Sequence, residues 1–368
     1  NIMHSLKRLG TAFGGYKMME NYPVPECGPD DIILEIKAAA ICGADMKHWG
    51  VDNGYDDTNI TPDQQQSVRG HEFAGEIVKV GENVKDWHIG QRVVSDNSAH
   101  VCGVCPACEQ GDFLCCEHKV NLGLDNNTWG GGFSKYCKVP GEILAIHKHA
   151  IWEIPEGIKY EEACVLDPIC NAYKAVAQQS HLIPGQDVVV FGTGPLGLFS
   201  VQVAKLMGAV NIVMVGLDDD VKVRFGVAKE LGATHCVNGS KEDVVARCTE
   251  ICGRDNLGLV IECSGANIAL KQAIEMTRPN AEIVRVGMGF KPLEFSINDI
   301  TAWNKSIIGH MAYDSTSWRN CIRLLQSGQI KVQPMITHRL GLSQWQEGFD
   351  KMAKKEAIKV IFHYDYED

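Results

Sequence analysis

A regular alternation of apolar strands and helices in the second half of the chain most constrains its fold. The expected strands are short runs rich in β-branched residues: Val188–Phe191, Ile212–Val215, Leu259–Cys263 and Glu282–Val286. Helices are expected after the first two strands, over 195–207 and 221–231. Strands that alternate with helices in this way predict an α/β fold with a parallel, doubly wound sheet.

A glycine-rich turn joins the first of these strands to the first helix. Its residues follow the pattern G-x-G-x-x-G: Gly192, Gly194, Pro195, Leu196 and Gly197. The first glycine allows a tight turn, the second lets a pyrophosphate approach the backbone, and the third lets the helix pack on the strand. Because the helix N-terminus attracts phosphates, this context predicts a dinucleotide site, and a purely structural turn is the alternative.

The second strand should lead to the residue that binds the adenosine ribose of a dinucleotide. An acidic residue is expected at its end, but that position is Gly216, and three aspartates follow at 218–220. These carboxylates would repel a 2′-phosphate, so the sequence favours NAD over NADP, with Asp218 as the cofactor-binding acid. Two alternatives stay open: the aspartates only begin the next helix, or Lys222 and Arg224 accept NADP. Arg224 is also a candidate for stacking on adenine.

Four cysteines lie close together in a loop-like stretch rich in Gly, Pro and small residues. Their spacing is C-x2-C-x2-C-x7-C, at Cys102, Cys105, Cys108 and Cys116. Tight turns bring the sulfurs of residues i and i+3 together, and four thiolates around one ion are typical of a closed structural zinc site. The neighbouring Cys115 lies outside this spacing. It is expected to be a packing residue, and a less favoured alternative has it replacing Cys116.

A second metal site is expected, with an open coordination position. Cys42 precedes a Gly-Ala-Asp segment, His71 and Glu72 follow Arg-Gly, and Asp167 ends an apolar stretch. One Cys, one His and one or two carboxylates suit a catalytic zinc, which keeps a position for water or substrate. Taken singly, each residue has an ordinary structural alternative: a buried thiol, a hydrogen-bonded histidine or a helix-capping aspartate.

Length and charge limit the remaining classes of protein. A chain of 368 residues exceeds one ordinary core, so two domains are expected. The net charge of -11 argues against a nucleic-acid partner, and no apolar run approaches the roughly 20 residues of a membrane helix. The N-terminal residues do not resemble a signal peptide. Most of the 15 cysteines are isolated in apolar segments, which is typical of reduced thiols in a cytoplasmic protein.

Together these motifs resemble those of the zinc-dependent medium-chain alcohol and polyol dehydrogenases, over nearly the whole chain. The resemblance rests on Cys42-Gly-x-Asp45, Gly70-His-Glu72, the four cysteines, Gly131-Gly-Phe133, the glycine-rich turn and Thr337-His-Arg339. It implies a GroES-like, mostly β catalytic domain over 1–169 and 306–368, with a zinc lobe at about 100–118, and a Rossmann domain over 170–305. It also implies two zinc ions per subunit: one structural, and one catalytic on Cys42, His71 and either Glu72 or Asp167.

The resemblance further implies hydride transfer from a secondary hydroxyl of a polyol or sugar alcohol to NAD, giving a ketose, in a homotetramer or homodimer. Two departures from the family pattern bear on this expectation. Ala44 stands where the family usually has the Ser or Thr of a proton relay, and Lys47 stands where many relatives have His. Lys47 and its neighbour His48 are therefore candidate outer proton carriers, beside Glu72 and Asp167.

Several alternatives remain at this point. A threonine or simple-alcohol dehydrogenase of the same family would be the nearest one. A zinc-free reductase of the wider family is disfavoured by the presence of Cys42 with His71. A metal-binding or redox module without dehydrogenase activity, with iron–sulfur on the four cysteines, would be a different class. A nucleic-acid-binding zinc ribbon is disfavoured by the acidic charge.

Overall fold

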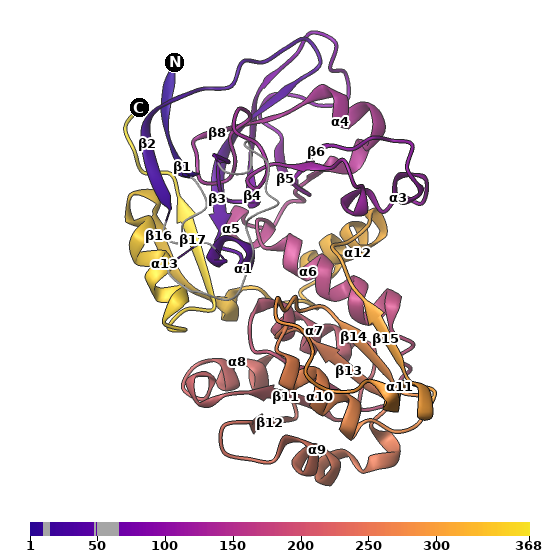
Figure 1. Cartoon of the computed structure of the whole chain (residues 1–368). Coiled ribbons are helices and arrows are strands. Elements are labelled where there is room, and N and C mark those ends of the chain that lie inside the picture. The colour runs from indigo at the N-terminus through magenta and orange to yellow at the C-terminus, as the bar shows by residue number, and fades with distance from the viewer. Residues whose placement is uncertain (10–14, 48, 50–65) are drawn as a thin grey trace. The chain divides into compact units, whose positions relative to one another are not determined.

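The computed structural model describes residues 1–9, 15–47, 49 and 66–368, which form two compact units (Figure 1). Unit 1 contains Asn1–Asp167, Asp314–Trp318 and Ile336–Asp368. Unit 2 contains Pro168–Tyr313 and Arg319–Met335. Each unit has a sheet and a buried core of its own, so the two are described separately.

Unit 2 is built on a six-stranded parallel sheet with the strand order β12-β11-β10-β13-β14-β15. The strands are β10 Val188–Phe191, β11 Ile212–Gly216, β12 His235–Asn238, β13 Leu259–Glu262, β14 Glu282–Arg285 and β15 Ser306–Gly309. The order runs outward in both directions from β10 and β13, which makes this pair the topological switch point where doubly wound sheets bind ligands. The prediction of a parallel, doubly wound α/β sheet is confirmed.

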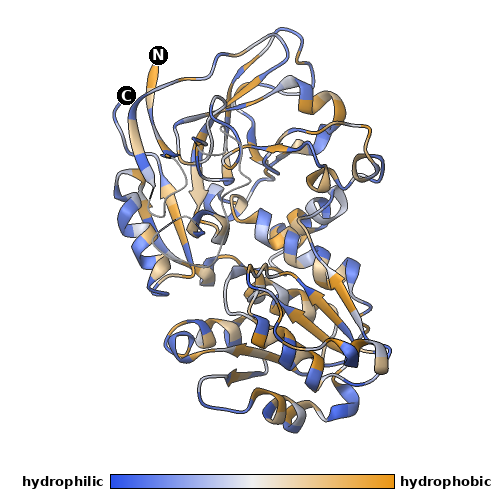
Figure 2. Cartoon of the chain, viewed as in Figure 1, coloured by the Kyte–Doolittle hydropathy of each residue, from blue (hydrophilic) through white to orange (hydrophobic). Residues whose placement is uncertain are grey.

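Helices pack against this sheet and bury its central strands, whereas the edge strand β15 is mostly exposed. All four residues of β10 are buried, as expected for a strand covered on both faces, and Figure 2 shows the strands of this sheet as hydrophobic. Among the described residues, every helix is too short or too polar to cross a lipid bilayer. The helices of this part of the chain are α6 Leu166–Tyr173, continued by the π-helical segment Lys174–Gln179, α7 Pro195–Leu206, α8 Arg224–Leu231, α9 Val244–Cys252, α10 Asn267–Met276, α11 Asn298–Ala302 and α12 Ser315–Gln326.

The sheet of unit 2 continues past residue 305, where the sequence placed a domain boundary. β15 pairs in parallel with β14, with Ile283 opposite Ile307 and Arg285 opposite Gly309. The crossover helix before β15 is α11, which has only five residues. So short a helix gives a weak periodic signal, which is why the sequence pattern placed the end of the alternation one strand too early.

Unit 1 consists mostly of antiparallel strands. Its main sheet has the order β16-β17-β3-β4-β5-β9, and β8 also pairs with β3. β17 joins β3 with Ile361 opposite Ala40, so the two ends of the chain share one sheet. The strands of unit 1 are β1 Ile2–Arg8, β2 Tyr16–Pro23, β3 Ile32–Ala40, β4 Glu72–Val80, β5 Arg92–Ser95, β6 Ser98–His100, β7 Val120–Asn121, β8 Tyr136–Val139, β9 Ile151–Glu153, β16 Ile336–Gly341 and β17 Lys359–His363. Its short helices are α1 Gly43–Met46, α3 Pro106–Glu109, α4 Gly141–Ile146, α5 Tyr160–Ala163 and α13 Trp345–Ala353.

Candidate active site

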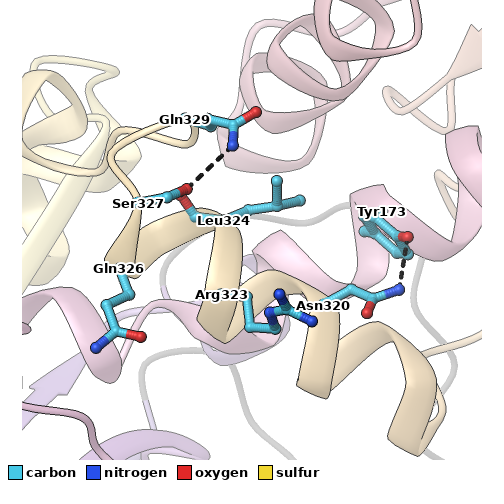
Figure 3. Close-up of a pocket in the computed structure, with 7 residues that line it drawn as sticks. All are labelled: Tyr173, Asn320, Arg323, Leu324, Gln326, Ser327 and Gln329. Carbon is cyan, nitrogen blue, oxygen red and sulfur yellow. Dashed lines mark hydrogen bonds between the residues drawn. The ribbon is translucent and has the colours of Figure 1, made fainter.

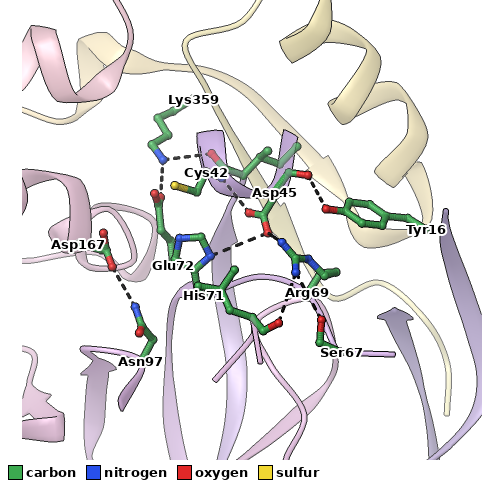
Figure 4. Close-up of polar contacts among 12 residues, drawn as sticks. Tyr16, Cys42, Asp45, Ser67, Arg69, His71, Glu72, Asn97, Asp167 and Lys359 are labelled. Carbon is green, nitrogen blue, oxygen red and sulfur yellow. Dashed lines mark hydrogen bonds and ion pairs between the residues drawn. The ribbon is translucent and has the colours of Figure 1, made fainter. Parts of the chain in front are cut away.

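Cys42, His71 and Glu72 form a close set of potential metal ligands in unit 1 (Figure 4). Cys42 follows β3 and precedes α1, while Glu72 begins β4 and His71 immediately precedes it. The antiparallel pairing of β3 with β4 places Glu72 opposite Ala40, so the two segments meet. One ligand atom of each residue lies within 4.8 Å of the others. A sulfur, an imidazole nitrogen and a carboxylate oxygen so close together fit a zinc ion.

The carboxylate of Asp45 supports two members of this close set. Asp45 is fully buried. Its Oδ2 accepts a hydrogen bond from the backbone N–H of Cys42 at 3.0 Å, and its Oδ1 lies 3.9 Å from Nδ1 of His71. Because Nδ1 of His71 faces Asp45, the other ring nitrogen, Nε2, is left for a metal. A carboxylate behind a metal-binding histidine orients the ring and modulates its basicity.

Glu72 forms a buried pair with Lys359 of β17. Nζ of Lys359 donates hydrogen bonds to Oε2 of Glu72 and, at 3.1 Å, to the backbone carbonyl of Ile41. Oε1 of Glu72 has no hydrogen-bond partner among the described residues, so it is the oxygen that an ion could take. Burial alone would lower the pKa of Lys359, but Glu72 and Cys42 beside it raise that pKa above its usual value. Lys359 is therefore a fixed positive charge next to the close set.

Asp167 lies near the close set without belonging to it. It is in the first turn of α6, and its Oδ2 accepts a hydrogen bond from Nδ2 of Asn97 at 3.0 Å. Burial raises the pKa of the Cys42 thiol, and the charges of Asp45 and Asp167 add to that rise. A bound cation would act in the opposite direction, since a coordinated thiol is deprotonated. Of the two carboxylates proposed from the sequence, Asp167 therefore acts on the Cys42 thiol from outside the close set, whereas Glu72 belongs to the close set.

Of the two candidate outer proton carriers, Lys47 and His48, the structure describes Lys47 alone. Lys47 follows α1 and is partly buried, and burial lowers the pKa of its amine. A lysine with a lowered pKa releases its proton more readily than an exposed one. His48 lies outside the described residues.

The four cysteines converge in the loop that contains α3. Their sulfur atoms all lie within 4.8 Å of one another, and Cys102 Sγ is 4.0 Å from Cys108 Sγ. Hydrogen bonding from the backbone N–H of Val104 lowers the pKa of Cys102 to about 6, whereas burial raises the pKa of Cys108 to about 12. A bound cation would favour the thiolate form of both. Four sulfurs and no other donor fit a closed structural zinc site. Cys115 is exposed, so its expected role as a packing residue is wrong.

The four-cysteine cluster gives a metal-content prediction. Cys108→Ser should reduce bound zinc from about two ions per chain to about one, because three thiolates and a hydroxyl form a poor structural zinc site. Zinc would be counted by mass spectrometry of the native protein. Cys115→Ser is the matched control, since Cys115 lies in the same loop but outside the cluster, and it should retain both ions. Two ions in both variants would contradict the assignment.

The turn between β10 and α7 has the shape that a dinucleotide requires. Gly192 has a φ of +95°, in the left-handed region that favours glycine. A Cβ at Gly197 would lie 1.8 Å from the carbonyl oxygen of Gly192, so helix and strand pack too closely for any side chain there. A Cβ at Gly194 would meet nothing within 4 Å, so open space faces the turn at this point. Pro195 and Leu196 begin α7, whose N-terminus would attract phosphates.

The end of β11 explains why glycine stands where an acid was expected. A Cβ at Gly216 would lie 2.7 Å from Cγ2 of Thr193, which belongs to the glycine-rich turn. The nearest exposed acid is Asp218, two residues further on. Its Oδ1 accepts a hydrogen bond from Nδ2 of Asn238 at 2.7 Å, and this bond lowers the pKa of Asp218. Asp218 is therefore an ionised carboxylate close to the turn.

The other two candidates at this end of β11 have local partners. Oδ2 of Asp220 accepts a hydrogen bond from the backbone N–H of Leu217 at 2.8 Å, as a residue that begins a helical turn does. Nη1 of Arg224 lies 3.7 Å from Oδ1 of Asp220, and the guanidinium is largely buried. Asp220 thus begins a helical turn, as the structural alternative for the three aspartates expected. Its carboxylate also offsets the positive charge that Arg224 would offer to a 2′-phosphate.

Unit 2 also contains a cavity of about 570 Å³ beside α12 (Figure 3). Its polar groups bond to one another: Nδ2 of Asn320 donates to the hydroxyl of Tyr173 at 2.9 Å, and Nε2 of Gln329 donates to Oγ of Ser327 at 3.2 Å. The residues around it include none of the potential metal ligands and none of the glycine-rich turn. This cavity is therefore not a candidate active site.

Sequence reasoning assigned no role to Asp45, Asn97 or Lys359, although all three support the candidate metal site. For Lys359 a signal was present, since a lone lysine interrupts the apolar run 358–362, and a buried lysine needs a partner. Asp45 belongs to the motif Cys42-Gly-x-Asp45, but its role as a support for Cys42 and His71 becomes clear only from the structure. Asn97 has no such signal, because its partner is 70 residues away.

Comparison with known proteins identifies the family. Residues 28–149 match the alcohol dehydrogenase GroES-like domain, and residues 195–327 match the zinc-binding dehydrogenase domain. The zinc-type alcohol dehydrogenase-like protein YdjL of Escherichia coli K12 is 76% identical over 366 residues, which cover 100% of both chains. The chain therefore belongs to the zinc-dependent medium-chain dehydrogenases and is an oxidoreductase.

More distant relatives have defined substrates in their names. An L-threonine 3-dehydrogenase of Rhizobium rhizogenes is 32% identical over 373 residues, covering 99% of both chains. A sorbitol dehydrogenase of Halalkalibacterium halodurans is 30% identical over 348 residues, covering 94% of this chain and 95% of the relative. Among solved structures, the 2R,3R-butanediol dehydrogenase of Bacillus subtilis is 28% identical, with a TM-score of 0.84 over 99% of this chain and 100% of that one.

Proposed function

We propose that this dehydrogenase oxidises a secondary hydroxyl of a polyol or sugar alcohol to the ketose, with NAD as the hydride acceptor. The close set of Cys42, His71 and Glu72 is the observation that carries the proposal, because three protein donors leave a position open for a hydroxyl. A zinc ion held there supplies Lewis acidity, which makes an alcohol hydroxyl easier to deprotonate.

Each proposed ligand has an atom placed for the role. Cys42 offers Sγ, His71 offers Nε2 and Glu72 offers Oε1, the oxygen not bonded to Lys359. Burial raises the pKa of Glu72, and the positive charge of Lys359 opposes that rise and balances part of the negative charge. Asp167 is proposed as the second carboxylate of the site, held by its hydrogen bond from Asn97.

A proton must also leave the reacting hydroxyl. Ala44 has no hydroxyl to carry it, so we assign this role to the candidates named from the sequence: Glu72, Asp167, Lys47 and His48. The lowered pKa of Lys47 supports its inclusion, because its amine can exchange a proton closer to neutral pH than an exposed lysine can.

NAD is the proposed cofactor. The glycine-rich turn of Gly192, Gly194 and Gly197 suits the pyrophosphate, and Asp218 would accept hydrogen bonds from the adenosine ribose. Its ionised carboxylate would repel a 2′-phosphate. NADP is the competing cofactor, since a dehydrogenase from Sinorhizobium meliloti solved with NADP is 26% identical, with a TM-score of 0.83.

Polyol substrates are supported by the named relatives. Besides the sorbitol dehydrogenase, a D-arabitol-phosphate dehydrogenase of Enterococcus avium is 30% identical over 367 residues. The threonine dehydrogenases favour a second candidate, the secondary hydroxyl of L-threonine. Both candidates require the same hydride transfer from a carbinol carbon, so they differ only in what surrounds that carbon.

A substrate panel tests the proposal. The purified protein would be given sorbitol, erythritol, threitol, arabitol, L-threonine and simple alcohols, each with NAD and with NADP, and reduced cofactor followed at 340 nm. The proposal expects the highest kcat/KM for a polyol with NAD. A preference for L-threonine or a simple alcohol would replace the substrate assignment, and a preference for NADP would replace the cofactor assignment.

Assembly into a homodimer or homotetramer is part of the same proposal, because the family resemblance implies it. Light scattering of the purified protein would give the number of chains directly. A monomer that is fully active on its substrate would contradict this part and leave the proposed reaction intact.

A further inference from the structure

Arg69 is a buried arginine that has no part in the proposed reaction. Only 3% of its surface is exposed, and it lies two residues before His71. Its Nη2 donates to Oδ1 of Asp45 at 3.2 Å, and its Nη1 donates to Oγ of Ser67 at 3.4 Å and to the carbonyl of Leu124 at 3.5 Å (Figure 4). A buried guanidinium is costly unless it is paired, so its position beside the metal site calls for an explanation.

Tyr16 contacts both Arg69 and Asp45. The guanidinium carbon of Arg69 lies 5.4 Å from the centre of the Tyr16 ring, which is a cation–π contact. The hydroxyl of Tyr16 donates to the backbone carbonyl of Asp45 at 2.5 Å. Arg69 and Asp45 are thus fixed relative to each other by contacts that do not involve the metal ligands. The pair forms a rigid support behind the close set.

One oxygen of Asp45, Oδ1, lies between Arg69 and His71 but bonds only to Arg69 of these two. Oδ2 accepts a hydrogen bond from the backbone N–H of Cys42. Oδ1 accepts the hydrogen bond from Arg69, whereas Nδ1 of His71 lies 3.9 Å away, beyond hydrogen-bonding distance. Within the described residues, Nδ1 of His71 is buried without any other partner. Arg69 therefore holds the carboxylate oxygen that lies nearest to Nδ1 of His71.

We propose that Arg69 is a positioning residue that limits how strongly His71 donates electrons to the metal, by drawing Oδ1 of Asp45 away from the ring. The proposal rests on the proposed metal site. A full hydrogen bond from Nδ1 to a carboxylate makes imidazole a stronger ligand. A metal with stronger donors is a weaker Lewis acid. By sharing Asp45, Arg69 keeps the metal electron-poor, which is what deprotonation of an alcohol requires.

Cobalt substitution tests this inference without any substrate. Cobalt(II) replaces zinc in such sites and absorbs visible light according to its ligands. The spectrum of Cys42→Ala, which retains only the four-cysteine site, would be subtracted from each protein. Arg69→Met should shift the cobalt bands and tighten cobalt binding by about tenfold, the scale of effects from residues behind metal ligands, while kcat falls. Arg69→Lys retains the charge and should restore both properties toward wild type.

The direction of the affinity change separates this role from a purely structural one. Loss of structural support alone would weaken cobalt binding, so weaker or unchanged binding with an unchanged spectrum in Arg69→Met would overturn the inference. Arg92→Met is the matched control: its guanidinium lies 4.6 Å from the Tyr160 ring and donates to the carbonyl of Ile158 at 2.5 Å, away from the close set. It should leave the cobalt spectrum unchanged.

Two further measurements keep the inference testable. If Arg69→Met does not fold, Arg69→Gln removes the charge while retaining a hydrogen-bond donor, and the same band shift and tighter binding are expected. In an Asp45→Asn background, replacing Arg69 should no longer tighten binding, because the shared charge is gone. Tightening of equal size in both backgrounds would overturn the inference. Wild-type protein that binds no cobalt at Cys42 would instead overturn the proposed metal site.

Discussion

Cys42→Ala is expected to abolish turnover: kcat/KM should fall at least about 10³-fold, because Lewis-acid stabilisation is worth several kcal/mol and each 1.4 kcal/mol is tenfold in rate. The close set would be reduced to His71 and Glu72, so the catalytic zinc should be lost. NADH binding, measured by fluorescence titration, should be unchanged. The glycine-rich turn lies in unit 2, whereas Cys42 lies in unit 1.

Cys27→Ala is the matched control for this prediction. Cys27 is another partly buried thiol of unit 1, and its Sγ contacts the carbonyl of Asp31 at 3.5 Å, outside both cysteine-containing metal sites. It should retain both zinc ions and full activity. Full activity in a Cys42→Ala protein shown to contain only the zinc of the four-cysteine site would disprove the proposed mechanism.

The sequence predicted the nucleotide-binding sheet well because its signals are local. Val188–Phe191 is a continuous apolar run followed at once by glycines, and the structure has β10 and the turn at these residues. The same holds for the four cysteines, whose spacing of two residues can place the sulfurs around one ion through local turns alone. In both cases the residues that determine the structure are neighbours along the chain.

The support of the metal site could not be predicted because it depends on distant segments. Lys359 reaches Glu72 across 287 positions, only because β17 pairs with β3. Arg69 is 24 positions from Asp45, and nothing in their spacing shows that the two side chains meet. The sequence therefore identifies the residues that can bind the metal. Which buried charges balance and orient them becomes clear only once the strands are paired.

Lys359→Met is expected to lower the free energy of unfolding of zinc-free protein by about 3–5 kcal/mol, the usual cost of removing one partner of a buried ion pair. Lys359 is 1% exposed and is the hydrogen-bonding partner of Oε2 of Glu72. Without it, that carboxylate and the Cys42 thiol lose the buried cation that faces both of them. Zinc would supply the missing positive charge, so the loss should be smaller in zinc-loaded protein. Urea unfolding of both forms, each against wild type, measures the difference.

Two further variants separate the charge of Lys359 from its hydrogen bonding: Lys305→Met, and Lys359→Met combined with Glu72→Gln. Lys305 is also buried, but its Nζ donates to the backbone carbonyls of Ile274 and Thr277, at 2.6 and 2.7 Å, so its loss should cost the same with or without zinc. Adding Glu72→Gln to Lys359→Met removes the unbalanced carboxylate and should recover most of the stability lost in zinc-free protein. If stability does not return, the bond from Lys359 to the carbonyl of Ile41 matters more than the charge pair. Recovery of stability without zinc binding would show that uncharged side chains at positions 72 and 359 suffice for folding, and that the charges of Glu72 and Lys359 serve the metal.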